Sequence, residues 1–210
     1  MKLEYFSMSV DGQTVEQWIS KGRFLRQRGQ NKKAIEAYEK ALKGDPGNID
    51  ALNELGLTQI HVGDQMLAIE AFDKAIIANP DDPRAYANKA EAFLTVGDFD
   101  NALAAAESGL EKAPESADLW VKKARSLESL LRIDDAIEAY NEALKYDSEE
   151  PETWKALALC YDAKMEWGSV ARAYRIAASL HLKRGERRDA DYCERFAVDA
   201  EDSASDEKMA

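Results

Sequence analysis

A period of 34 residues constrains what this chain can fold into more than any other feature of its sequence. Five blocks follow one another without insertion or deletion, at 15–48, 49–82, 83–116, 117–150 and 151–184. The eighth residue of every block is small: Gly22, Gly56, Ala90, Ala124 and Ala158. Small columns that recur in this way indicate helices in close contact, because larger side chains would hold the two axes apart.

Large side chains fill the columns that complement the small ones. The fourth residues of the blocks are Trp18, Leu52, Tyr86, Trp120 and Trp154, and the twenty-fourth are Tyr38, Phe72, Ala106, Tyr140 and Tyr174. Within a block the apolar residues recur at spacings of 3, 4 and 7, which is typical of helices and not of strands. Gly29, Gly63 and Gly97 mark a turn between two such runs. Each block is therefore predicted to be a helix–turn–helix hairpin.

The block at 49–82 carries the fullest version of this pattern, in Leu52, Leu55, Gly56, Gly63, Ala68, Phe72, Ala75 and Pro80. The pattern resembles the tetratricopeptide repeat, and the resemblance extends over about 170 of the 210 residues. It implies an all-α fold, a right-handed superhelical α-solenoid of stacked antiparallel helix hairpins. The later blocks depart from the pattern, with Leu131 where the fourth block would have its turn glycine and Met165 at the same place in the fifth.

Both ends of the chain lie outside the repeats. Helical spacing of Tyr192, Cys193, Phe196, Ala197 and Ala200 predicts an amphipathic capping helix for the fifth hairpin, placed at 185–199. The acidic segment 200–210 is predicted to be a disordered tail. The segment 1–14 is too apolar for a free tail, since it holds Leu3, Tyr5, Phe6, Met8 and Val10. We expect it to cover the first hairpin, to occupy a groove or to contact a second copy, and the sequence leaves these alternatives open.

Composition narrows the classes of partner and compartment. The formal net charge of −12 argues against a nucleic-acid partner and against adhesion to an anionic membrane surface. No run approaches 18 apolar residues, and the first residues do not form a secretory signal. Two cysteines, Cys160 and Cys193, offer neither a disulfide framework nor metal-ligand spacing. A soluble cytoplasmic protein is the expectation.

Catalytic chemistry is not indicated by any motif. His61 and His181 stand 120 residues apart without a cluster of ligands, and each is expected to be a surface residue. The acidic pairs, such as Asp81–Asp82 and Asp134–Asp135, fall at helix starts and turns, where negative charge favours the helix dipole. We therefore expect no enzyme activity, no catalytic residues, no metal site and no cofactor.

The resemblance implies that the first helix of each hairpin lines a concave face where a partner polypeptide binds. One subgroup of the family grips the C-terminal carboxylate of chaperones with a clamp of five basic and Asn residues. Here only Asn88 and Lys122 match that clamp in the better frame, and Asp118 would repel a carboxylate, so the clamp is absent.

The remaining candidates for partner binding on the first helices are Arg84, Asn88, Lys122 and Arg125. These side chains suit an acidic or C-terminal segment of a partner, through charge-assisted hydrogen bonds. The sequence thus predicts a non-catalytic scaffold or adaptor that binds a peptide or helix of another protein. The alternative is a self-assembling scaffold, a homo-oligomer joined through the N-terminal segment or the outer faces.

Overall fold

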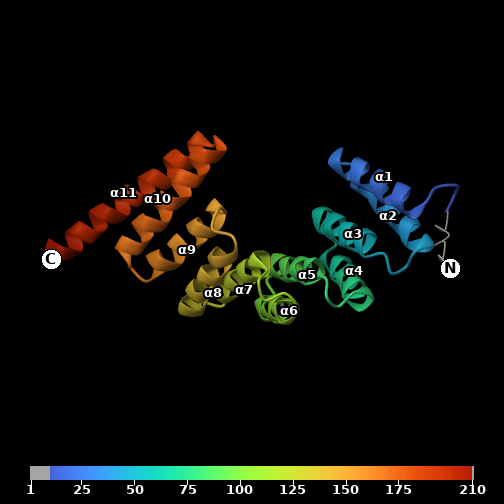
Figure 1. The fold of residues 1–210 in the computed structure, drawn as a ribbon, viewed down its shortest axis with the longest axis horizontal. Coiled ribbons are helices and arrows are strands. Elements are labelled where there is room, and N and C mark those ends of the chain that lie inside the picture. The colour runs from blue at the N-terminus through green and yellow to red at the C-terminus, as the bar shows by residue number, and fades with distance from the viewer. Residues whose placement is uncertain (1–9, 210) are drawn as a thin grey trace, which may run out of the picture. The chain divides into compact units, whose positions relative to one another are not determined.

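The computed structural model describes the backbone of residues 10–209 and the side chains of residues 10–205. Apart from an isolated bridge between Val10 and Gln13, this part of the chain consists of helices and their connections (Figure 1). The helices are α1 (Val15–Gln27), α2 (Asn31–Gly44), α3 (Ile49–Val62), α4 (Gln65–Ala78), α5 (Pro83–Val96), α6 (Phe99–Lys112), α7 (Ala117–Ser129), α8 (Ile133–Tyr146), α9 (Pro151–Ala163), α10 (Trp167–Arg184) and α11 (Arg187–Met209). The predicted all-α class of stacked hairpins is confirmed, and each odd-numbered helix from α1 to α9 begins at the first residue of a 34-residue block.

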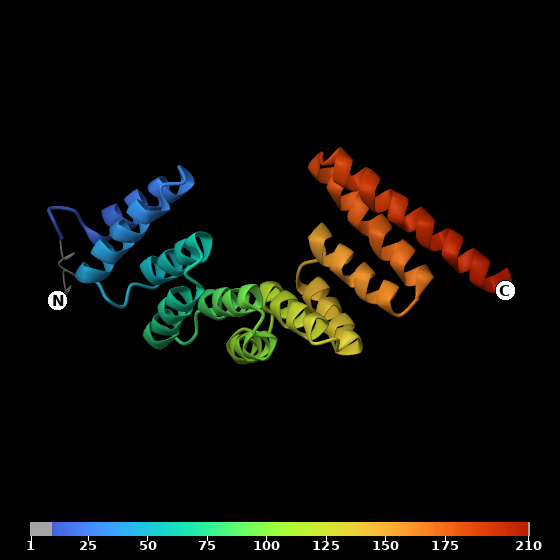
Figure 2. The same cartoon turned by 180° about the vertical axis from the view of Figure 1, so that it is seen from behind.

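The chain divides into two compact units, Met1–Ala113 and Pro114–Ala210. In the first unit, the hairpins α1/α2, α3/α4 and α5/α6 stack in chain order, and the first helices α1, α3 and α5 also contact one another. In the second unit, α7/α8 and α9/α10 stack in the same way, and α11 packs along α10. Figure 2 shows both sets of helices from behind. Within the described residues, no helix combines the length and apolar character needed to cross a membrane.

The core of the first unit depends on rings that lie against glycines. A Cβ built on Gly56 would lie 2.5 Å from the Cε1 atom of Phe72, whose side chain is fully buried. In the second unit the corresponding pair is Ala124 and Tyr140, both fully buried, so there the same column accommodates a methyl group. The small and large columns of the sequence therefore face each other across each hairpin, as close packing requires.

The fourth residue of four blocks also donates a hydrogen bond to a carbonyl in the segment before its own helix. This indole or phenol group gives a partner to a backbone acceptor of the turn, and at Val10 it adds to the bond from the backbone N–H of Gln13. The bonds, all of 2.8–3.0 Å, run from Trp18 to Val10, from Tyr86 to Pro80, from Trp120 to Pro114 and from Trp154 to Ser148. In the remaining block the position is Leu52, which has no donor.

The turn inside each hairpin keeps a left-handed residue whether or not glycine is present. Gly63 and Gly97 adopt φ angles of 91° and 80°, which glycine reaches without steric cost. Leu131 and Met165 adopt 60° and 59° at the same place in their blocks. Their side chains are 84% and 68% exposed, so no burial compensates for the strain in either turn.

The N-terminal end of the described chain contacts the first hairpin. Val10 packs against the core cluster that contains Val15 and Trp18, and Asp11 forms a 2.8 Å ion pair with Lys40. Of the apolar residues expected to lie in this segment, Leu3, Tyr5, Phe6 and Met8 fall outside the described residues.

The disordered tail predicted from residue 200 is wrong for the residues described, because α11 continues to Met209. Ala200 is only 5% exposed and extends the buried stripe formed by Cys193 and Ala197. Glu201 pairs with Arg175 of α10 at 2.6 Å. The capping helix thus extends beyond the predicted segment 185–199. Its acidic C-terminal part packs against α10 through a buried alanine and an ion pair between the two helices.

Candidate protein-interaction surface

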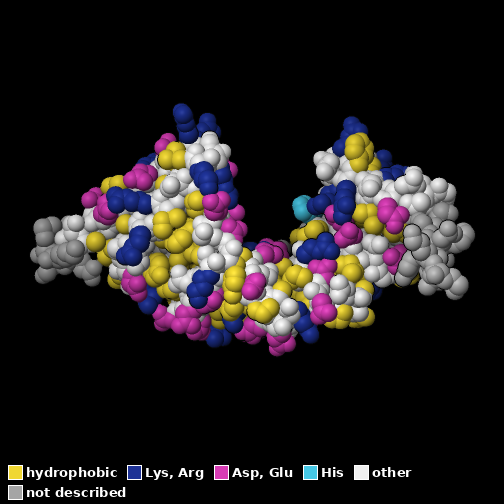
Figure 3. Space-filling model, viewed as in Figure 1, with side chains coloured by type: hydrophobic (Ala, Val, Ile, Leu, Met, Phe, Trp, Pro, Cys, Tyr) yellow, Lys and Arg dark blue, Asp and Glu magenta, His cyan; other side chains and the backbone are white. Residues whose placement is uncertain are grey.

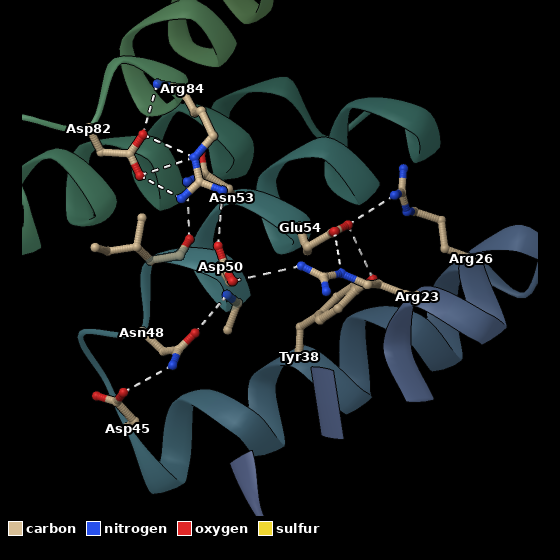
Figure 4. Close-up of polar contacts among 12 residues, drawn as sticks. Arg23, Arg26, Tyr38, Asp45, Asn48, Asp50, Asn53, Glu54, Asp82 and Arg84 are labelled. Carbon is tan, nitrogen blue, oxygen red and sulfur yellow. Dashed lines mark hydrogen bonds and ion pairs between the residues drawn. The ribbon is translucent and has the colours of Figure 1, made fainter. Parts of the chain in front are cut away.

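The first helices of the first unit are joined by a ladder of charged and amide groups (Figure 4). Glu54 of α3 accepts from the Nε atom of Arg23 at 2.6 Å and lies 2.9 Å from the Nη2 atom of Arg26, both in α1. Asp50, one turn earlier in α3, lies 3.1 Å from the Nη1 atom of Arg84 in α5. Each rung joins residues about one repeat apart, so the ladder fixes the first helices relative to one another.

Arg84, a predicted partner-binding residue, is engaged by two carboxylates. Its Nε and Nη2 atoms donate to Asp82 at 3.0 and 2.7 Å in a forked pair, in addition to the contact with Asp50. Asp82 is also the N-cap of α5 and accepts from the backbone N–H of Arg84 at 3.0 Å. The guanidinium of Arg84 lowers the pKa of the Asp82 carboxyl below its ordinary value. An anionic partner would therefore compete with acids of the chain itself, although 61% of the Arg84 side chain remains exposed.

Asn88 belongs to the same ladder. Its Nδ2 atom donates to Oδ1 of Asn53 at 2.9 Å, and Asn53 in turn donates to the carbonyl of Ile49 at 3.1 Å. Asn53 is only 6% exposed, so this amide chain passes from the surface of α5 into the interface with α3. Asn88 thus has a structural role whether or not it contacts a partner.

The other two predicted residues, Lys122 and Arg125, lie in the second unit on α7. The Nζ atom of Lys122 is 3.5 Å from Asp118, and the lysine side chain is 17% exposed. Arg125 lines a pocket of about 490 Å³ between α7 and α9, beside Val121, Tyr140 and Ala156. Arg84 and Asn88 thus lie in the first unit, and Lys122 and Arg125 lie in the second. A patch that joins all four residues stays a prediction.

Several polar groups of this pocket were not among the residues predicted from the sequence. Tyr140 belongs to the large-residue column and is fully buried, yet its hydroxyl donates to Glu128 at 2.8 Å, and the residue is one of those that line the pocket. Burial and the neighbouring Glu128 carboxylate raise the pKa of Tyr140, so it stays a neutral donor. The acids at the rim have partners of their own: Glu150 pairs with Arg184, and Glu152 pairs with Lys155. The pocket therefore combines an apolar floor with a rim of mixed charge (Figure 3 shows such mixing over the visible surface).

His181 corrects an expectation, because it is 3% exposed and not a surface residue. Its Nδ1 atom lies 2.7 Å from Oε2 of Glu186, just after the end of α10, and its Nε2 atom lies 3.8 Å from Oε1 of Glu152 in α9. His181, Glu186 and Asp189 each offer a ligand atom within 4.8 Å of the others. Both carboxylates are exposed, and the hydrogen bond to Glu186 holds the Nδ1 side of the imidazole, while among the described residues the buried Nε2 atom has no hydrogen-bond partner. His61 is exposed, as expected.

Helical hairpins of constant length, stacked through matched small and large columns, define an α-solenoid repeat protein. Residues 22–63 match the family model described as TPR repeat, and residues 54–117, 87–151 and 121–174 match the one described as Tetratricopeptide repeat. The chain belongs to the tetratricopeptide repeat family. This membership suggests a protein–protein interaction scaffold.

Solved structures share this fold. A thermophilic TPR protein of Thermus thermophilus is 21% identical, with a TM-score of 0.72 over 88% of this chain and 99% of that one. MamA of Desulfovibrio magneticus is 19% identical, with a TM-score of 0.68 over 80% and 96%. PilF of Pseudomonas aeruginosa is 18% identical, with a TM-score of 0.68 over 85% and 88%. No curated protein sequence matches the chain. At these identities the likeness shows the fold alone.

Proposed function

We propose that the chain is a non-catalytic adaptor that binds a peptide or helix of a partner protein along its first helices. The observation that carries this proposal is the pocket of about 490 Å³ between α7 and α9. Its volume suits one or two side chains of a bound segment, and Val121 and Ala156 give it apolar contact area. Thr153 and Arg125 add polar groups that can fix the orientation of the segment.

Arg84, Asn88, Lys122 and Arg125 are the residues proposed to contact the partner. Arg125 lines the pocket, and Lys122 lies one turn before it on α7. The exposed part of the Arg84 side chain leaves room for a further acceptor beside Asp50 and Asp82. Because Arg84 and Lys122 already contact acids, we expect the partner's acidic groups to add orientation and specificity more than affinity.

Affinity capture from the source cell, followed by mass spectrometry, tests the proposal and identifies the partner. We expect Ala156→Phe, which fills the pocket between α7 and α9, and the double variant Lys122→Glu with Arg125→Glu to lose that partner. The matched control is Lys145→Glu on the second helix α8, where the lysine side chain is 63% exposed. Capture that survives both pocket variants, in proteins whose circular dichroism is unchanged, would remove this surface from consideration.

Self-assembly remains a second candidate because the second-helix side of the first unit exposes large apolar residues. Ile77, Met66 and Leu67, all on α4, are 79%, 68% and 49% exposed. Solvent exposure of such side chains favours burial against another surface. Light scattering on the chain with and without residues 1–14, and on Ile77→Lys, separates the possibilities. If every form of the chain is a monomer, self-assembly is excluded.

A further inference from the structure

The capping helix α11 forms a second pocket together with α9 and α10. Its volume is about 320 Å³, and it lies entirely within the second unit. Three aromatic side chains line it, Trp167 and Tyr174 from α10 and Phe196 from α11. Two carboxylates, Asp162 of α9 and Asp199 of α11, line it as well.

The aromatic side chains that line the pocket pack against one another and stay partly exposed to solvent. Tyr174 is 3% exposed, and its ring centroid lies 5.3 Å from that of Phe196. Phe196 also contacts Tyr192 at 4.6 Å, yet 39% of its surface stays exposed. Leu159, on the opposite helix, is 52% exposed. Figure 3 shows hydrophobic side chains open to solvent over α9 and α10. The aromatic side chains thus offer ring surface to a ligand without any rearrangement of the core.

The charge of the pocket is of one sign. No lysine or arginine is among its lining residues. Within the described side chains, neither Asp162 nor Asp199 has a hydrogen bond or ion pair to its carboxylate, although both are exposed. Arg175, the nearby cation of α10, is engaged by Glu194 and Glu201. Burial, then the neighbouring Tyr192 and Asp162, raise the pKa of Tyr174 to about 12.

Aromatic faces and carboxylates favour the same ligand. The face of an aromatic ring carries partial negative charge and attracts a cation such as the ammonium group of lysine or the guanidinium group of arginine. An apolar ligand would bury carboxylates without a partner, and an anion would be repelled by both of them. A volume of about 320 Å³ holds a long side chain but not a helix.

We propose that this pocket binds the cationic side chain of a lysine or arginine carried by a partner polypeptide. The inference rests on the proposed function, since it supposes a polypeptide partner, and it adds a contact on the capping helix. The alkyl stem would pack against Phe196 and Trp167, while the charged end would lie between Asp162 and Asp199. A basic residue of the partner would thus bind at a site that the repeats alone do not form, because α11 supplies part of it.

Nuclear magnetic resonance titration of the full chain tests the proposal with blocked tripeptides. The probes are acetyl-Gly-Lys-Gly-amide, its arginine counterpart, and a norleucine counterpart that lacks the charge. We expect the lysine or arginine peptide to shift the Trp167 indole and the Ser203 amide saturably, with at least about tenfold weaker binding of norleucine. The double variant Asp162→Asn with Asp199→Asn should weaken the basic peptide at least about tenfold. Phe196→Leu should weaken it as well.

The control is Glu138→Gln with Asp191→Asn, which removes the same charge from exposed positions of the second unit that do not line the pocket. Equal binding of the norleucine and lysine peptides overturns the inference, as does unchanged lysine-peptide binding in the Asp162/Asp199 variant. Binding of free tetramethylammonium without binding of either basic peptide overturns it too. These outcomes are independent of capture through the pocket between α7 and α9, so the proposed function can fail or stand separately.

Discussion

The aromatic ring of Tyr38 lies on the bare α-carbon of Gly22, where an added Cβ would come within 2.4 Å of the ring's Cε1 atom. Tyr38 is fully buried, so its ring cannot swing away without disturbing the core of the first hairpin. This contact sets the distance between α1 and α2. The same relationship holds between Gly56 and Phe72 in the second hairpin.

Gly22→Ala should therefore destabilise the protein, by about 1–3 kcal/mol, because one methyl group overpacks the interface. The matched control is Gly168→Ala, since that helical glycine has no atom within 4 Å of a built Cβ. There the gain in helix propensity should stabilise by about 0.5–1 kcal/mol. Urea unfolding of both variants measures the difference. Equal effects of the two substitutions would contradict the packing account.

Leu131→Gly and Met165→Gly should each raise stability by about 1 kcal/mol, since both residues sit in the left-handed region with exposed side chains. The opposite substitution, Gly97→Ala at the corresponding turn, should lower stability by about 1 kcal/mol. Thermal unfolding monitored by circular dichroism gives the comparison. Loss of stability in both glycine variants would mean that these leucine and methionine side chains have a contact that outweighs the strain.

Asp82→Asn tests the forked pair with Arg84 while it preserves a good N-cap. The folded-state pKa of Asp82 lies below its ordinary value of 3.8, so the pair stabilises the fold above that pH and is lost as the carboxyl protonates below it. We expect Asp82→Asn to cost on the order of 1 kcal/mol at pH 7. The difference from the wild type should shrink as pH falls below 3.8. A constant difference from pH 7 to pH 2 would show that the charge of Asp82 contributes nothing.

Two truncations compare how much the two parts of α11, before and after Ala200, contribute to the stability of the fold. Removal of residues 201–210 deletes the Glu201–Arg175 pair but leaves Ala200, so we expect a loss of at most about 1 kcal/mol. Removal of residues 186–210 uncovers Ala177, Ala178 and Tyr174, and should make the second unit unfold at much lower temperature or aggregate. Differential scanning calorimetry resolves the two cases. Similar melting of both truncated chains would show that α11 does not act as a cap.

The repeat could be predicted from the sequence because its signals are local and recur. Small residues such as Ala90 and large ones such as Trp120 keep their columns, and the helices start where those columns place them. The end of α11 could not be predicted in this way. Its acidic composition argues for disorder, and only the buried position of Ala200 and the pairing of Glu201 with another helix offset that argument.

The candidate surface was harder to predict than the fold, because pairing depends on contacts between repeats. Arg84 is predicted from the sequence to contact a partner protein, yet one of its partners within the chain, Asp50, lies 34 residues earlier. His181 reads as an isolated surface residue, yet it is 3% exposed and lies against Glu186, in the connection that leads to α11. Tyr140 reads as a core residue, and its place in the column gives no sign that it lines a pocket.

The hydrogen bonds from the fourth residue of four of the five blocks have a consequence for how the stacked hairpins separate. Wherever the donor is tryptophan or tyrosine, a hairpin cannot separate from the segment before it without breaking that bond. Because Leu52 has no donor, the junction between the first and second hairpins lacks this hydrogen bond. Local fluctuations of the first unit should therefore begin at that junction, and the amide protons of the segment from Asp45 to Asn48 should exchange with solvent sooner than those of the junctions that have the bond.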